Sequence, residues 1–124
     1  MSKTVLIVED EPNIVESLAF LLQRDGFTVR TISDGAAAMA ELVQTAPDVV
    51  ILDVMLPNVS GFDILSSIRG HDRFARLPVM MLTAKGQRRD RDRAEELGAD
   101  IFVTKPFSNT EIVAEVRRLA ERVA

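Results

Sequence analysis

Short apolar runs alternate with longer amphipathic stretches along this chain, and the alternation predicts strands separated by helices. The run at 49–52 is apolar without a break, which is typical of a strand covered on both faces. The run at 27–32 alternates polar and apolar side chains, which favours an edge strand. The five expected strands span residues 5–8, 27–32, 49–52, 79–82 and 101–103.

Helices are predicted where apolar residues recur at spacings of three and four. Pro12 suits the first turn of the first helix, because proline lacks the amide donor that would be unpaired there. Asp25 and Gly26 are expected to end that helix. The apolar faces consist of Ile14, Leu18, Leu21 and Leu22, then Ala38, Met39 and Leu42, then Phe62, Ile64, Leu65 and Ile68, and finally Ile112, Val116, Leu119 and Val123.

The segment 86–97 predicts a further helix that is far more charged than the others. Ala94 and Leu97 are the clear apolar residues that it offers to a core. So small an apolar face predicts a helix that opens or shifts more easily than its neighbours. The pairs expected to support it, by ~0.2–0.5 kcal/mol each, are Arg88–Asp92 and Arg91–Glu95.

The order of elements predicts the fold. Strands joined by helices pair in parallel through right-handed crossovers, which places helices on both faces of the sheet. We therefore expect a doubly wound α/β fold. With 124 residues and no linker or low-complexity segment, the chain 1–124 is expected to form one domain.

Composition excludes several classes of protein. Hydrophobic residues make up 47% and charged residues 27% of the chain, which excludes a disordered polypeptide. Cysteine is absent, so disulfides and thiolate chemistry are excluded. The net charge of −4 argues against direct nucleic-acid binding, and the short apolar runs argue against a signal peptide or a membrane span. We expect a cytoplasmic protein with no membrane partner.

Polar residues follow the predicted strands where each one ends. Because ligands of parallel α/β sheets bind beyond the carboxyl ends of the strands, these residues are expected to converge. Carboxylates this close raise each other's pKa unless a cation neutralises them, and Mg²⁺ with its oxygen ligands is the simplest remedy. The residues are Glu9, Asp10 and Glu11 after the first strand, Asp53 after the third, Thr83 after the fourth and Lys105 after the fifth.

Each of these residues also has an ordinary structural interpretation. Acids at a helix start are favoured by the helix dipole, and a lone Asp at a strand end is commonly a cap or turn residue. Taken alone, Thr83 is typical of a strand, Lys105 of a surface and Phe102 of a core. Their joint appearance at successive strand ends favours a phosphate-and-metal site over these separate explanations.

Four stretches, VLIVEDEPNI, VVILDVMLPNVSGFDIL, VMMLTA and GADIFVTKPFS, carry a family resemblance. In this order and spacing they resemble the response-regulator receiver domain of bacterial two-component signalling, over residues 3–123. The resemblance implies a flavodoxin-like sheet of five parallel strands in the order 2-1-3-4-5, with helices on both faces.

The resemblance also implies a reaction. Asp53 would accept a phosphoryl group from the phosphohistidine of a sensor histidine kinase or phosphotransfer protein. Glu9 and Asp10, with Asp53 and the Met55 backbone carbonyl, would hold Mg²⁺. The residue types agree, since a carboxylate can attack phosphorus. The domain would be a switch rather than an enzyme, with at most self-phosphorylation and self-dephosphorylation activity.

A signalling route is implied as well. Thr83 and Lys105 would contact the phosphoryl oxygens, and the peptide bond between Lys105 and Pro106 would be cis. Phe102 holds the position of the rotating aromatic residue of receivers, and it would turn inward as Thr83 moves. The charged helix, the fifth strand and the last helix would then control a downstream protein or a fused output domain.

Assembly and context stay open. Glu111 and Glu115 lie where winged-helix transcription-factor regulators usually carry basic residues, so both a monomer and a phosphorylation-dependent dimer remain possible. A stand-alone receiver and one excised from a larger protein both fit the length.

Three alternatives differ in class. A flavodoxin-type enzyme is disfavoured, because acids after the first strand would repel a flavin phosphate. A haloacid-dehalogenase-type phosphatase needs a second Asp at the position of Met55. A receiver-like interaction module that signals without phosphate would lack an acid, the acceptor or the lysine, and the sequence retains all of them.

Overall fold

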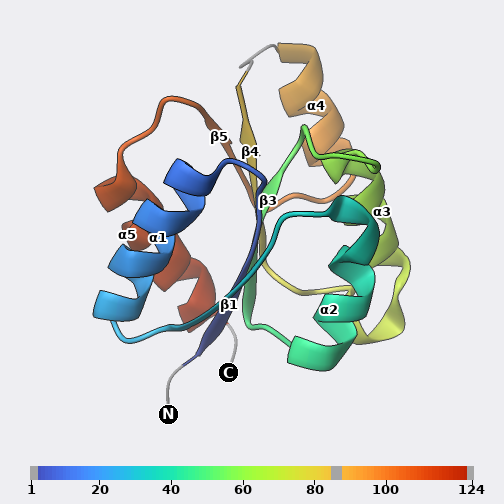
Figure 1. Ribbon diagram of the computed structural model, residues 1–124. Coiled ribbons are helices and arrows are strands. Elements are labelled where there is room, and N and C mark those ends of the chain that lie inside the picture. The colour runs from blue at the N-terminus through green and yellow to red at the C-terminus, as the bar shows by residue number, and fades with distance from the viewer. Residues whose placement is uncertain (1–2, 85–87, 123–124) are drawn as a thin grey trace.

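A computed structural model describes residues 3–84 and 88–122. Its centre is a parallel sheet in the order β2-β1-β3-β4-β5, which is the predicted doubly wound topology (Figure 1). The edge position of β2 agrees with its alternating pattern, and β3 is buried along its whole length as expected. The strands are β1 (Thr4–Val8), β2 (Thr28–Ile32), β3 (Val49–Asp53), β4 (Val79–Thr83) and β5 (Ile101–Thr104).

Helices cover both faces of the sheet. Helices α1 and α5 lie together on one face, and α2, α3 and α4 lie on the other (Figure 1). Two short 3₁₀ turns, η1 (Gly35–Ala37) and η2 (Asp72–Phe74), are additions that the periodicity did not predict. The α-helices are α1 (Pro12–Arg24), α2 (Ala38–Thr45), α3 (Gly61–Gly70), α4 (Arg88–Glu96) and α5 (Asn109–Glu121).

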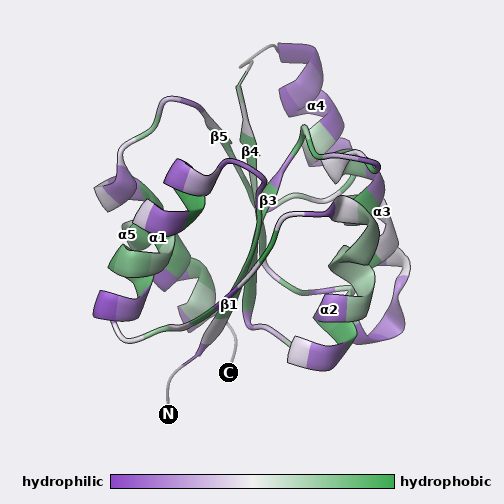
Figure 2. Cartoon of the chain, viewed as in Figure 1, coloured by the Kyte–Doolittle hydropathy of each residue, from purple (hydrophilic) through white to green (hydrophobic). Residues whose placement is uncertain are grey.

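The sheet divides the core in two, because successive side chains of a strand point to opposite faces. In β1, Val5 and Ile7 pack under α1 and α5, whereas Leu6 and Val8 pack under the other three helices. Figure 2 shows the result: the central strands are hydrophobic and the outer faces of the helices are hydrophilic. The carboxyl ends of β1, β3, β4 and β5 therefore emerge from a rigid, close-packed base.

The strands extend slightly beyond their apolar runs. Asp53 pairs with Leu82, and Thr83 pairs with Thr104, so both polar residues are the last members of their strands rather than the first of a loop. The apolar run ends at the last hydrophobic side chain, whereas the backbone pairing of the strand continues for one more residue. This places the Asp53 and Thr83 side chains on the rigid part of the sheet.

Helix α4 is as lightly packed as its composition predicts. Ala94 is its buried residue, and Leu97, just beyond its end, is half-buried against the same core. An ion pair joins Arg88 to Asp92 at 3.9 Å between exposed side chains. The predicted Arg91–Glu95 pair is absent from the ion pairs of residues 88–122, and Arg91 instead lies over a ring of β5. Residue 86 and Val123, which the sequence analysis assigned to helices, lie outside the described residues.

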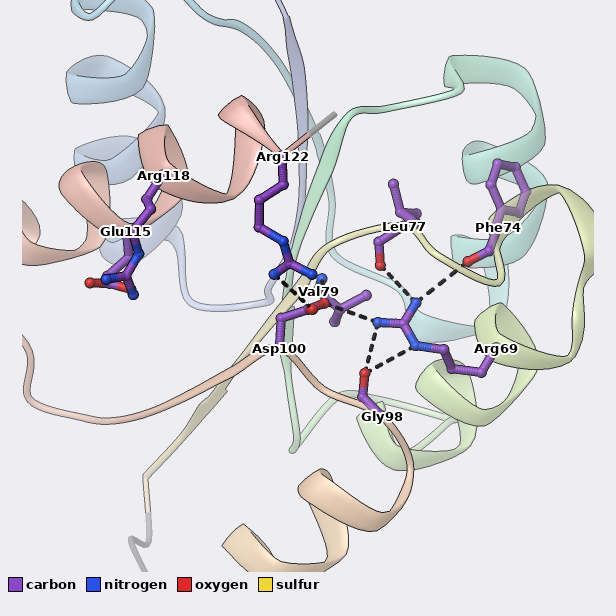
Figure 3. A network of polar contacts seen from close by, with 9 residues as sticks. All are labelled: Arg69, Phe74, Leu77, Val79, Gly98, Asp100, Glu115, Arg118 and Arg122. Carbon is purple, nitrogen blue, oxygen red and sulfur yellow. Dashed lines mark hydrogen bonds and ion pairs between the residues drawn. The ribbon is translucent and has the colours of Figure 1, made fainter. Parts of the chain in front are cut away.

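A polar clamp joins several elements at the amino end of the sheet, opposite the predicted site (Figure 3). The Arg69 guanidinium donates to the carbonyls of Leu77 and Gly98 and to Asp100 Oδ2, at 2.7–3.0 Å. Asp100 also accepts from the Val79 amide at 2.8 Å and from Arg122 at 3.0 Å. The clamp links α3, the start of β4, the turn before β5 and the end of α5, and nothing in the sequence pattern predicted it.

Within the two described stretches, no helix combines the length and the apolar composition that crossing a bilayer requires.

Candidate functional site

The predicted site residues converge at the carboxyl edge of the sheet. The ammonium group of Lys105, just after β5, lies at the centre of the cluster. Its Nζ is 3.0 Å from Glu9 Oε1, 3.2 Å from Asp53 Oδ2 and 3.5 Å from Glu11 Oε1. Acids at the ends of β1 and β3 therefore share one lysine, which follows β5 and lies nearly a hundred positions from Glu9 in sequence. The peptide bond from Lys105 to Pro106 is cis, the isomer that the resemblance implies.

Burial divides the site into a fixed base and an open rim. Glu9, Asp53 and Thr83 are 1%, 2% and 2% exposed, whereas Asp10 and Glu11 are exposed. The buried carboxylates are held by the close-packed strand ends below them. The open rim gives a ligand access to these fixed groups.

Local backbone geometry orients the two buried acids. Glu9 Oε2 accepts hydrogen bonds from the amides of Asp10 at 2.9 Å and Glu11 at 3.1 Å. Asp53 Oδ1 accepts from the Met55 amide at 3.1 Å. Each strand end thus turns back on its own carboxylate, which leaves Glu9 Oε1 and Asp53 Oδ2 directed at the lysine.

The charges shift two pKa values. Burial raises the pKa of Glu9 above its usual value, and the neighbouring Asp53 carboxylate raises it further. Burial alone would lower the pKa of Lys105, but the carboxylates of Glu9 and Asp53 outweigh it and raise that pKa. The lysine is therefore held in its charged form, while the acids carry negative charge that one ammonium group does not balance.

The acids have the composition of a divalent-cation site. Glu9, Asp10 and Asp53 each offer a carboxylate oxygen, and these oxygens lie within 4.8 Å of one another. Glu9 Oε1 is buried, and among the described residues it has no hydrogen bond of ordinary geometry, its approach to Lys105 being an ion pair. A hard cation such as Mg²⁺ prefers oxygen ligands, so this donor set fits it. Met55, whose carbonyl was predicted as a further ligand, has a 72% exposed side chain beside the site.

Thr83 and Phe102 lie on the neighbouring strands β4 and β5. The Thr83 carbonyl accepts a hydrogen bond from the Lys105 amide at 2.7 Å, which ties the lysine-bearing turn to the end of β4. Phe102 is half-buried and packs against the core under α2, α3 and α4. Of the two residues predicted to form a switch, Thr83 thus contacts the lysine-bearing turn and Phe102 contacts Arg91 of α4.

Gly61 supports Asp53 in a way that the sequence analysis did not identify. A Cβ at Gly61 would lie 2.1 Å from the Asp53 carbonyl oxygen and 2.8 Å from Val54 Cα. The Gly61 amide donates to the Val54 carbonyl at 2.8 Å. Helix α3 therefore begins in backbone contact with the chain that carries Asp53, which only a residue without a side chain allows.

A doubly wound parallel sheet with an acid cluster and a lysine at its carboxyl edge is the arrangement that the resemblance to receiver domains implies. The sequence pattern of the response regulator receiver domain matches residues 5–117, and the chain belongs to that family. Receiver domains of response regulators are signalling switches rather than classical enzymes, as the sequence analysis expected.

Curated relatives agree with this assignment. The chain is 43% identical over 119 residues to the sensory transduction protein RegX3 of Mycobacterium tuberculosis, covering 96% of this chain and 51% of the relative. It is 38% identical over 124 residues to the phosphate regulon transcriptional regulatory protein PhoB of Escherichia coli, covering all of this chain and 54% of PhoB. The chain therefore spans about half the length of the curated relatives it matches.

Solved structures share the fold over nearly the whole chain. A putative response regulator from Chloroflexus aurantiacus superposes with a TM-score of 0.92 at 33% identity, covering 98% of this chain and 100% of that one. The BeF₃-activated DrrB receiver domain superposes with a TM-score of 0.89 at 33% identity, with the same coverage. These matches confirm the predicted fold and family.

Proposed function

We propose that Asp53 accepts a phosphoryl group from the phosphohistidine of a sensor histidine kinase or phosphotransfer protein. The observation that carries the proposal is the position of Lys105, whose ammonium group is 3.2 Å from Asp53 Oδ2 and 3.0 Å from Glu9 Oε1. A phosphoryl group on Asp53 brings three acceptor oxygens and about one further negative charge to this cation.

Asp53 is suited to act as the nucleophile. Its carboxylate is buried at the end of β3, so its direction of attack is fixed before the donor arrives. The transition state of phosphoryl transfer is loose and spreads negative charge over three oxygens, so positioning and countercharge do most of the work. Lys105 supplies a positive charge there, and the Thr83 hydroxyl supplies a neutral donor.

Glu9, Asp10 and Asp53, with the Met55 carbonyl, would hold Mg²⁺ in the unphosphorylated and phosphorylated domain. When bound, the ion supplies positive charge that offsets the repulsion among these carboxylates and the incoming phosphoryl group. The raised pKa of Glu9 supports this role, because a bound cation would stabilise its ionised form. The buried Glu9 Oε1 supports it as well, because this atom lacks a hydrogen-bond donor among the described residues.

The signal would leave through Thr83 and Phe102. Thr83 moves toward the phosphoryl oxygens, Phe102 turns into the space behind it, and the surface of α4, β5 and α5 changes. The light packing of α4 supports this route, since few buried contacts resist its displacement. A few kcal/mol of differential interaction is enough to shift such an equilibrium usefully.

The wider setting belongs to the same proposal. Residues 1–124 form one receiver domain that acts in the cytoplasm, without binding nucleic acid or membranes. It controls either a separate protein or a fused output domain, and it has at most self-phosphorylation and self-dephosphorylation activity. RegX3 and PhoB, each about twice as long as the matched region, support the fused form. The domain is a monomer or a phosphorylation-dependent dimer.

Intact-mass measurement after incubation with acetyl phosphate and Mg²⁺ tests the reaction. The chain is expected to gain about 80 Da, the mass of one phosphoryl group, and the gain is expected to require Mg²⁺. Asp53→Asn removes the nucleophile and is expected to abolish the gain, whereas Asp63→Asn, an exposed acid on α3, keeps it.

A wild-type chain that gains no mass beside an active receiver would overturn the proposal and favour an interaction module that works without phosphate. Equal labelling of Asp53→Asn and wild type would move the acceptor to another residue.

A further inference from the structure

Two arginines of α4 lie over two aromatic rings beneath the helix. The guanidinium carbon of Arg93 is 5.0 Å from the centroid of Phe62, and that of Arg91 is 5.6 Å from the centroid of Phe102. Both distances fall within the range of cation–π attraction. Because Ala94 is the buried residue of α4, these two contacts add to a small apolar interface.

The two rings differ in their freedom to move. Phe62 is 7% exposed at the start of α3, directly after Ser60, whose side chain accepts from the Phe62 amide at 3.2 Å. Phe102 is half-buried on β5, with Arg91 over its ring. Phe has no hydroxyl group that could tether the ring, whereas the Arg91 guanidinium contacts its face.

We propose that Arg91 is a positioning residue that holds Phe102 in the orientation seen in this structure and so opposes activation of the domain. This inference rests on the proposed function, because it assigns Phe102 the motion described there. The Arg91 contact exists while the ring keeps this orientation and is lost when the ring turns inward. The Arg93 contact is made to a ring on α3, and it does not involve Phe102.

Only an interaction that differs between two states shifts their equilibrium. Removing Arg91 therefore raises the population of the inward state. Removing Arg93 leaves the contact between Arg91 and the Phe102 ring in place. A cation–π contact at an exposed site corresponds to a population ratio of about two to five. Since a ligand that selects the inward state binds in proportion to the population of that state, its apparent affinity rises by the same factor.

The absent Arg91–Glu95 pair supports this assignment. A guanidinium group paired with Glu95 would be drawn along the helix axis and away from β5. Among the residues that the structure describes, Arg91 forms no ion pair, so its charge is directed at the ring. In α4, Arg91 therefore contacts Phe102 on β5 rather than Glu95 four residues along the helix.

The test is a titration with beryllofluoride and Mg²⁺, followed by ¹⁹F NMR of chains labelled with 4-fluorophenylalanine. The chain has six Phe and no Tyr or Trp, so the spectrum is simple, and Phe102→Leu assigns the resonance of interest. Arg91→Gln is expected to raise the apparent affinity about two- to five-fold and to shift the Phe102 resonance of the free protein toward its bound position. Arg93→Gln, the matched control, is expected to leave the Phe102 resonance of the free protein unchanged.

A double-mutant cycle gives the sharper result. In the Phe102→Leu background the Arg91→Gln change is expected to have no effect on affinity, because the ring it acts through is gone. An equal gain in affinity for Arg91→Gln and Arg93→Gln, or a gain that persists without the ring, would overturn the inference. Failure of the wild type to bind beryllofluoride would instead count against the proposed function.

Discussion

Single atoms set the geometry of this site. Gly61 lacks the one carbon that would collide with the Asp53 carbonyl, and Glu9 and Asp53 each direct one oxygen at the same ammonium group. The buried acids are costly to ionise together, and this cost is the physical basis for a site that binds positive charge. Two residues therefore offer direct tests of how the site is supported.

Gly61→Ala is expected to destabilise the domain by about 1–3 kcal/mol, because the added Cβ forces α3 away from the chain that carries Asp53. Gly70→Ala, in the same helix, is the matched control. Its Cβ meets nothing within 4 Å, so a small stabilisation of about 0.5 kcal/mol is expected. Urea unfolding of both variants measures the difference, and a Gly61→Ala chain as stable as wild type would contradict the close contact.

Glu9→Gln is expected to gain stability relative to wild type as pH rises in metal-free buffer. The pKa of Glu9 is raised in the folded chain, so its stabilising contribution is present below its unfolded pKa and is lost as pH rises through the folded pKa. The difference in unfolding free energy should therefore grow above about pH 4.5 and then level off. Glu11→Gln is the control, because the Glu11 carboxylate is exposed. Its difference in unfolding free energy is expected to grow less with pH. A difference that stays flat from pH 4 to pH 8 would refute it.

Among the elements, the two ends of the sheet are held differently. At the carboxyl end α4 rests on one buried alanine and two arginine–ring contacts. At the amino end Arg69 and Asp100 join α3, β4, β5 and α5 through direct hydrogen bonds (Figure 3). Under the proposed function, a change at the carboxyl edge would therefore move α4 more easily than the opposite edge.

Arg69→Ala is expected to cost about 1–3 kcal/mol of unfolding free energy, because it leaves the part-buried Leu77 carbonyl without this donor and removes the ion pair with Asp100. Arg118→Ala, which removes an exposed pair with Glu115 in the same view, is expected to change stability by less than about 0.5 kcal/mol (Figure 3). Thermal or urea unfolding separates the two. Equal effects would mean that the clamp contributes no more than a surface pair.

At the scale of the whole molecule, cation binding at this edge would be coupled to folding, because acids from different strand ends come together only in the folded chain. Mg²⁺ at ten times its dissociation constant is expected to raise the unfolding free energy by about 1.4 kcal/mol. Asp10→Asn is expected to lose most of this stabilisation, and Asp72→Asn, an exposed acid on η2, to keep it. Denaturant unfolding with and without Mg²⁺ measures the gain, and equal curves for the wild type would argue against a cation at this edge.

Local patterns predicted the elements and the candidate site residues. Strand and helix periodicity depends on neighbouring residues, so β3, β2 at the edge and the lightly packed α4 could all be anticipated. Convergence of Glu9, Asp53 and Lys105 followed too, because parallel strands bring their carboxyl ends to one edge.

Contacts across the fold could not be read from such patterns. Arg69 and Asp100 are 31 positions apart, and no periodicity links them. The close approach of Gly61 to the Asp53 carbonyl depends on how α3 packs against the sheet. Similarly, the position of α4 determines that Arg91 contacts Phe102 rather than Glu95. Periodicity specifies which face of an element is buried, whereas the partner of a polar side chain depends on distances that exist only after all elements have packed.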